Sequence, residues 1–225
     1  MNIIELGILN EKPVKVELVT IPKGSFMMGG NTYKDESPIH QVSFEKPFKM
    51  SKNVITQPQF EVVMKYNNSR EKDSSLPITN VTWFEAVEFC EKLSELKEIK
   101  VSLPSESQWE YACRAGTNTE YYCGDKLLKA NKKETNKYII EPNKWKLHNM
   151  YGLVFQWCVD DYHYNYINAP SDGTAWCEKN GFCKCIRGGS SASHSAMWLR
   201  SRMRMLSHAD SRSFNTGFRI VVNSI

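Results

Sequence analysis

Three capping boxes constrain this chain more than any other feature of its sequence. In a capping box, a hydroxyl residue at the start of a helix is followed three residues later by Glu or Gln. The three pairs here are Thr56 with Gln59, Thr82 with Glu85, and Ser105 with Gln108. Apolar residues follow each pair with a helical period, so we expect helices over about 56–66, 82–97 and 105–115.

Short alternating segments surround these helices and predict half-buried strands. They lie at 14–18, 26–28, 40–44, 48–50, 153–159, 199–205 and 218–222. The first two are expected to pair as a hairpin, because Pro22-Lys23-Gly24 forms a turn between them. Residues 117–150 and 160–184 lack such a period and predict long loops, which in compact domains are usually functional or disordered.

Composition places the chain among ordinary globular proteins. Its 225 residues are enough for one large or two small domains, and a net charge of +4 is too weak to indicate nucleic-acid binding. No apolar run is long enough for a bilayer, and the N-terminus lacks a signal-peptide pattern. We therefore expect a cytoplasmic protein, with phage association or another export route as alternatives. Most of its seven cysteines are expected to be buried thiols.

Five segments, taken in order, resemble the formylglycine-generating enzyme (sulfatase-modifying factor) domain family. They are residues 37–60, 76–93, 101–117, 142–157, and 186–191 with 215–221. The most specific is LPSESQWEYA with Arg114 and Gly116, and the match spans about 16–222. The resemblance implies one α+β domain over residues 1–225 with a variant C-type lectin fold. Such a fold has a small twisted antiparallel sheet, few helices, and irregular loops held by buried Trp and Arg.

The family includes copper-dependent oxidases, iron sulfoxide synthases and non-catalytic ligand-binding proteins, so the site must decide the function. In the oxidases, two cysteines after Arg-Gly-Gly-Ser hold Cu(I), which selects sulfur ligands. The matching positions here are Ser193 and Trp198, and no cysteine follows Cys185. We therefore reject formylglycine synthesis and interpret Cys183-x-Cys185 as a structural or incidental pair.

The resemblance also points to calcium sites whose ligands this sequence does not keep. The family segment Gly-Asn-Val-Trp-Glu-Trp is represented by residues 152–157, with Leu153 in place of Asn and Gln156 in place of Glu. These replacements remove an oxygen ligand and a negative charge that Ca²⁺ favours. Asn131 matches one ligand of a second family calcium site. We expect the calcium site to be lost and assign no cofactor.

Arginines recur through the C-terminal forty residues. Arg187, Arg200 and Arg219 are expected to make buried bonds to acids and backbone carbonyls. Alternatively, Arg200, Arg202, Arg204 and Arg212 could form a basic stripe for phosphate. Aromatic residues do not interleave with them, so nucleic acid is not a favoured partner. Trp83, Trp109 and Trp157 are expected to lie in the core.

Between two scaffold-like ends, Arg187-Gly188-Gly189 and Gly217-Phe218-Arg219, lie small or adaptable side chains without a packing period. The segment is similar to the variable region of diversity-generating retroelement proteins, which use the same fold and bind ligands with it. That similarity implies a preorganised surface for a protein or other macromolecule. The candidate ligand-binding residues, here called the C-terminal surface, are Ser191, Ser193, His194, Ser195, Met197, Trp198, Leu206, Ser207, His208, Asp210, Ser211, Ser213 and Phe214.

Three alternatives to ligand recognition stay open at this point. The C-terminal surface could be an ordinary solvated loop. The chain could be a divergent metal-dependent oxidoreductase that uses His194, His208 or Cys185. It could also be an inactive subunit that serves only structure. The family's iron enzymes take their His ligands from an extra helical domain that this sequence lacks, and no two histidines here have helical spacing.

Overall fold

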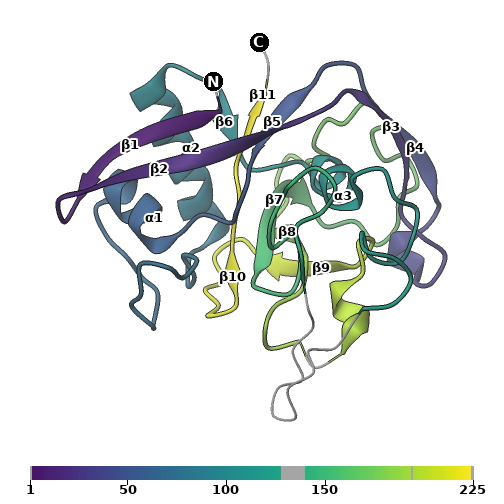
Figure 1. Ribbon diagram of the computed structural model, residues 1–225. Helices are drawn as coiled ribbons and strands as arrows, with labels where there is room; N and C mark the ends of the chain where they lie inside the picture. The colour runs from purple at the N-terminus through teal and green to yellow at the C-terminus, as the bar shows by residue number, and fades with distance from the viewer. Residues whose placement is uncertain (1, 128–139, 194, 224–225) are drawn as a thin grey trace.

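The structure is a computed structural model that describes residues 2–127, 140–193 and 195–223. Its largest sheet has the strand order β1-β2-β5-β11-β6 and crosses the top of the molecule (Figure 1). These strands are β1 (Ile3–Leu9), β2 (Lys12–Ile21), β5 (Phe48–Ser51), β11 (Val221–Asn223) and β6 (Val101–Ser102). The chain's last strand thus lies between two much earlier ones, which ties the C-terminal segment to the rest of the fold.

Two smaller sheets complete the architecture of the described residues. One has the order β10-β7-β8-β9, formed by β10 (Thr216–Gly217), β7 (Phe155–Asp161), β8 (Cys183–Arg187) and β9 (Arg204–His208). The other pairs β3 (Gly24–Met28) with β4 (His40–Phe44). All strand pairs are antiparallel except β10 with β7.

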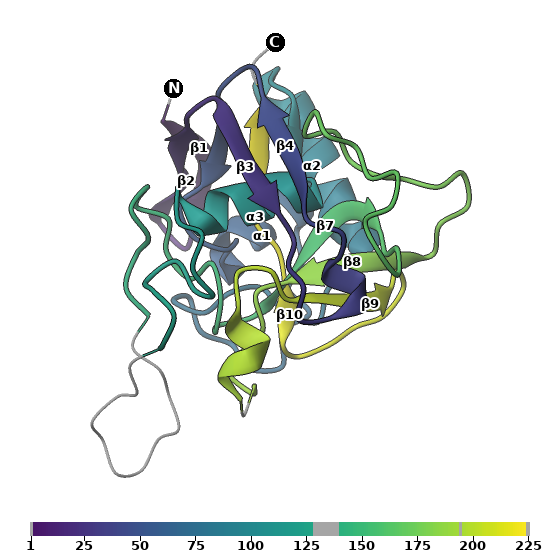
Figure 2. The ribbon, with the colours of Figure 1, turned by 90° about the vertical axis from the view of Figure 1, so that its right-hand side faces the viewer.

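The three predicted helices are confirmed as α1 (Gln57–Met64), α2 (Trp83–Lys97) and α3 (Glu106–Arg114). All three capping boxes are present. Two short 3-10 helices, η1 (Lys34–Glu36) and η2 (Ala196–Leu199), were not predicted. None of the helices in the described residues is long and apolar enough to cross a membrane. Every residue of α3 is buried, and Figure 2 shows this helix crossing the molecule behind β3 and β4.

Three strand predictions need correction. The hairpin between β2 and β3 is wrong, because β1 and β5 occupy the two edges of β2 and β3 pairs with β4 instead. The predicted strand over 199–205 is also wrong, since η2 and a turn come first and the strand begins at Arg204. The last strand begins at Val221 rather than Phe218, although the Phe218 carbonyl still accepts a hydrogen bond from Ile55 N.

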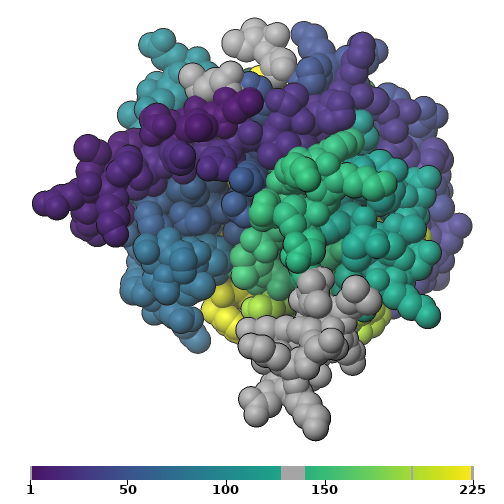
Figure 3. Space-filling view, viewed as in Figure 1, coloured from purple at the N-terminus to yellow at the C-terminus, as the bar shows by residue number. Residues whose placement is uncertain are grey.

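The core has two clusters on either side of the central strands. One lies among α1, α2 and the faces of β1, β2, β7 and β8, and contains Trp157. The other surrounds α3 and contains Trp109. Trp83 packs partly buried against the first cluster, so all three tryptophans serve the core as predicted. In Figure 3, β1 and β2 run across the upper part of the face in view, and the loop after α3 lies below them on the right.

Candidate ligand-binding surface

The N-terminal end of the candidate segment is held by Arg187, whose side chain is fully buried. Its guanidinium donates to Glu106 Oε1 at 2.8 Å and to the Ser201 carbonyl at 2.8 Å, and it also bonds Glu110. Both acids are on α3, which has no exposed face. Arg187 therefore fixes the start of the segment to the most buried helix of the fold.

The C-terminal end is held by Arg219, which is also fully buried. Its guanidinium donates to the carbonyls of Ser51, His148 and Asn149 and to Gln156 Oε1. The ends also approach each other, since Asn215 Nδ2 donates to Ser190 Oγ at 3.5 Å. The prediction that Arg187, Arg200 and Arg219 make buried bonds to acids and carbonyls is confirmed.

Gln156 occupies the position where the family segment has Glu, and its whole amide is engaged inside the protein. Its Oε1 accepts from Trp109 Nε1 at 2.8 Å and from Arg219 Nε at 2.7 Å. Its Nε2 donates to the carbonyls of Met150 and Asn149 at 2.9 and 3.0 Å. A side chain with both a donor and an acceptor suits this position better than a carboxylate. Asn131, the other residue matched to a family calcium site, lies outside the described residues.

The alternative of a free basic stripe is wrong, because each of its arginines lies beside a carboxylate. Their partners are Glu36 for Arg200, Glu120 for Arg202, Glu106 for Arg204, and Glu85 for Arg212. Two of these pairs, at Arg200 and Arg204, are buried. Arg200 and Arg204 therefore help to hold the scaffold together, whereas the pairs of Arg202 and Arg212 lie nearer the surface.

Electrostatics around α3 are dominated by buried acids. Burial alone would raise the pKa of Glu106, but the charges of Arg204 and Arg187 outweigh it and lower that pKa to about 2. Nearby, burial and the charge of Glu106 raise the pKa of Asp160 to about 7. Cys185, a proposed metal ligand of the enzyme alternative, is fully buried and donates to Glu106 Oε1 at 2.9 Å.

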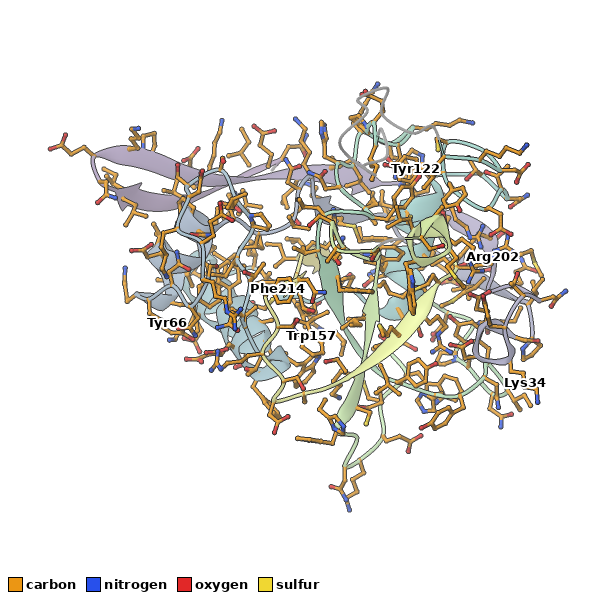
Figure 4. All side chains as sticks on the ribbon, turned by 90° about the horizontal axis from the view of Figure 1, so that it is seen from below. Lys34, Tyr66, Tyr122, Trp157, Arg202 and Phe214 are labelled. Atoms are coloured by element: carbon orange, nitrogen blue, oxygen red, sulfur yellow. The ribbon has the colours of Figure 1, made fainter. Side chains whose placement is uncertain are left out.

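Nine of the thirteen candidate residues fall into three groups. Ser191 and Phe214 form the first group and line a cavity of about 400 Å³. Its other wall comes from the loop between α1 and α2, with Arg70 and Leu76. Phe214 is 59% exposed, and Figure 4 shows it near the middle of the face seen from below.

Met197 and Trp198 form the second group on η2. They line a cavity of about 160 Å³ with Tyr33, Glu36, Arg200 and Arg204 among its other residues. Both side chains are exposed. Arg202, close to them in sequence, lies well to one side of Phe214 in Figure 4. The first two groups line different cavities, which share no residue.

Strand β9 and the turn after it carry the third group. Leu206, Ser207 and His208 are on the strand, and Asp210 and Ser211 follow it. Sequence reasoning missed Met205, which is 37% exposed on the same strand, and Phe182, whose ring lies 5.5 Å from that of His208. The strand period of 199–205 could have indicated Met205, but no sequence signal indicated Phe182.

The hydroxyl groups of three predicted serines form hydrogen bonds with residues close by in the chain. Ser193 Oγ accepts from Ser190 N at 3.0 Å, and Ser195 Oγ accepts from Met197 N at 3.4 Å. Ser213 Oγ donates to Asn215 Oδ1 at 2.6 Å. His194 lies outside the described residues. Among the cysteines, Cys90, Cys113, Cys158 and Cys185 are buried, as predicted for most of the seven.

Comparisons with known proteins support this assignment of fold and family. Residues 8–224 match the sulfatase-modifying factor enzyme 1-like domain. Serine/threonine-protein kinase pkn1 of Chlamydia caviae is 27% identical over 213 residues, which cover 79% of this chain and 33% of that protein. Formylglycine-generating enzyme of Streptomyces coelicolor is 26% identical over 167 residues, covering 64% of this chain and 51% of the enzyme. The chain thus spans a third to a half of the length of these relatives.

Solved structures share the fold over almost the whole chain. PvdO from Pseudomonas aeruginosa superposes with a TM-score of 0.82 at 25% identity, covering 93% of this chain and 95% of PvdO. Treponema denticola variable protein 1 superposes with a TM-score of 0.80 at 21% identity and the same coverage. The α+β fold and the predicted family are confirmed, and the likeness to a variable protein is confirmed at the level of the fold.

Proposed function

We propose that this chain, which belongs to the sulfatase-modifying factor enzyme 1-like domain family, is a non-catalytic protein that binds a macromolecular ligand through its C-terminal surface. One observation carries the proposal. Exposed side chains such as Trp198, Leu206 and Phe214 alternate along the chain with arginines whose guanidinium groups are bonded within the fold. The segment combines a fixed backbone with side chains available for contact.

Preorganisation makes such a surface suitable for recognition. The backbone around Trp198 is fixed by Arg200, which bonds Glu36 at 3.0 and 2.6 Å and the Met197 carbonyl at 3.1 Å. A ligand that binds here does not have to order the loop first, so less binding free energy is lost to entropy. Exposed aromatic and long apolar side chains supply contact area of the kind that dominates protein interfaces.

Loss of the copper ligands favours binding over oxidase chemistry. Ser193 and Trp198 stand where the oxidases hold two cysteines, and Ser193 Oγ is already bonded to the Ser190 amide. Neither a hydroxyl nor an indole is a good ligand for Cu(I). The shared fold of Treponema denticola variable protein 1 supports a further hypothesis, that the segment is diversified. A near-copy of the 3′ coding sequence that differs at adenines and precedes a reverse transcriptase gene would support it.

Affinity capture with matched variants tests the proposal. The site variant carries His194→Ala, Trp198→Ala, His208→Ala and Phe214→Ala. The control variant carries Phe84→Ala and Leu96→Ala, which remove exposed apolar side chains from α2 outside the C-terminal surface. We expect the site variant to lose a protein that wild type and control both retain. Calorimetry with that purified protein should give similar affinities for wild type and control and a weaker affinity for the site variant. Equal affinity for all three proteins would refute the assignment of the site.

A divergent metal-dependent oxidoreductase is the second candidate, favoured by one contact. Cys183 Sγ lies 3.8 Å from His208 Nδ1, on directly paired residues of β8 and β9. Thiolate and imidazole are common ligands of copper, zinc and iron. Elemental analysis of the purified protein discriminates between the two functions. Stoichiometric iron or copper that disappears in Cys183→Ser would favour the enzyme.

A further inference from the structure

We propose that the ligand of this protein is a protein that presents an extended segment, which adds as a fifth strand to the open edge of β9. The inference rests on the proposed ligand-binding function and specifies the form of the ligand. Strand β9 lies at the end of its four-stranded sheet, paired with β8 on one side. Within the described residues, no strand pairs with its other side.

The directions of the β9 backbone groups follow from one hydrogen bond. The Cys183 carbonyl accepts from Tyr162 N at 2.8 Å, so it faces β7 rather than β9. Backbone groups alternate in direction along a strand, so Lys184 and Ile186 face β9. Their register partners Ser207 and Met205 take up those bonds.

Leu206 and His208 therefore direct their backbone groups toward the open edge. The His208 carbonyl accepts from Ser211 N at 3.0 Å in the following turn. The Leu206 N–H and C=O and the His208 N–H have no hydrogen-bond partner in the described part of the chain. Such a row of donors and acceptors matches the backbone of another extended segment.

The edge also lacks three features that often protect edge strands, namely a bulge, a proline and a lysine. Its five residue pairs with β8 run without a register shift, and the strand contains neither Pro nor Lys. Arg204, the first residue of the strand and its only Arg, is bonded to Glu106. Met205 and Leu206, whose side chains point to opposite faces, are each 37% exposed. An added strand would meet apolar side chains on both faces.

A small cavity lies at the start of this edge. Arg204, the first residue of β9, also lines the 160 Å³ cavity formed with Met197, Trp198 and Met203. Its volume is below the roughly 300–1,000 Å³ of small-molecule sites. One apolar side chain of the added segment suits it, as an anchor beside the backbone hydrogen bonds. The second and third groups of the C-terminal surface then serve one ligand.

The test uses a displayed library of linear random peptides selected on the full wild-type chain. Enriched peptides are synthesised and their affinities measured for wild type, Leu206→Pro and Leu206→Val. Proline removes an N–H that faces the open edge, so the bonds between β8 and β9 are kept. We expect peptides with alternating apolar residues to bind Leu206→Pro about tenfold or more weakly and Leu206→Val within about threefold of wild type.

Amide hydrogen exchange in the wild-type complex provides a measurement that does not depend on the folding of a variant. Strand addition should slow exchange at the Leu206 amide and leave the Met205 amide, already bonded to β8, nearly unchanged. Failure to enrich any linear peptide refutes strand addition, as do peptides that bind without slowing the Leu206 amide. The broader binding function is still supported if the affinity for the captured protein depends on Trp198 and Phe214. Concentration-dependent dimers in sedimentation that Leu206→Pro abolishes would instead make a second copy the occupant.

Discussion

Nε of Arg219 donates a hydrogen bond to Oε1 of Gln156 at 2.7 Å, and both side chains are fully buried. The bond joins the last arginine of the chain to the strand where the family segment carries Glu. Gln156 completes the arrangement by donating to two carbonyls, which a carboxylate cannot do. The relationship shows how the C-terminal scaffold depends on a neutral amide at this position.

Replacing Arg219 with Lys should destabilise the protein strongly. The guanidinium serves Gln156 and three backbone carbonyls, whereas an ammonium group cannot reach all four. Buried acceptors left without donors cost about 1–3 kcal/mol each, so we expect a loss of about 3 kcal/mol in the free energy of unfolding. Urea denaturation measures it. Arg212→Lys, at an exposed pair with Glu85, should cost less than about 1 kcal/mol. Similar losses in both variants would contradict the structural role of Arg219.

Calcium should not change the thermal stability of this protein. The oxygen of Gln156 already accepts two hydrogen bonds, and its nitrogen donates to two carbonyls. Thermal unfolding is measured with excess calcium chloride and with EDTA, and the two curves should coincide. A Tm that rises with calcium would mean that other residues bind the ion, since ligands that prefer the folded state raise its stability.

Stability should fall as the pH rises from about 4 to about 7. Burial and the charge of Glu106 raise the pKa of Asp160 to about 7, compared with about 4 for an unfolded Asp. The folded state binds the additional proton in this window, so the free energy of unfolding decreases with increasing pH. Below about pH 4 the sign reverses, because the lowered pKa of Glu106 stabilises the fold only while its carboxylate stays ionised.

Asp160→Asn isolates this effect. The variant should lose most of the decrease between about pH 4 and 7 when urea denaturation is repeated across that range. Asp172→Asn changes an exposed carboxyl whose pKa is lowered by hydrogen bonds from Thr174, and it should keep the wild-type slope. A flat wild-type profile, or an unchanged slope in Asp160→Asn, would show that Asp160 is not protonated in the folded protein near neutral pH.

Local signals in the sequence predicted the helices but could not predict the strand pairing. The box of Thr82 with Glu85 acts within four residues, so α2 begins where the sequence places it. The pairing of β11 with β5 and β6 joins residues far apart in the chain, and no local period contains that information. The same reason explains the wrong hairpin, because only the whole sheet shows that β1 and β5 occupy both edges of β2.

The candidate surface was predictable as a segment but not as an arrangement. Small and mixed residues between the arginines indicated the segment, and some of its side chains, such as Trp198 and Phe214, are exposed. That Ser191 shares a cavity with Arg70, while Trp198 shares another with Tyr33, depends on how distant loops meet. The open edge of β9 could not be predicted either, because an edge is defined by which strands are absent beside it.

Gly189→Ala should disturb the C-terminal surface directly. Gly189 has a φ of +61°, and a Cβ there would lie 2.5 Å from the Trp198 carbonyl oxygen and 2.8 Å from Leu199 Cδ2. The backbone at Trp198 would have to move, which shifts the side chain that lines the 160 Å³ cavity. We expect weaker binding of the selected peptides and a loss of about 2–4 kcal/mol in the free energy of unfolding.

Gly116→Ala separates backbone strain from this steric clash. Gly116 has a similar positive φ of +85°, but a Cβ there would meet no atom within 4 Å. The control should therefore cost only the strain of a left-handed alanine, about 1 kcal/mol, and leave peptide affinity unchanged. If both variants lose the same stability and bind equally well, the contact between Gly189 and Trp198 does not position the surface. A loss confined to Gly189→Ala would instead link the Arg187-Gly188-Gly189 motif to ligand recognition through Trp198.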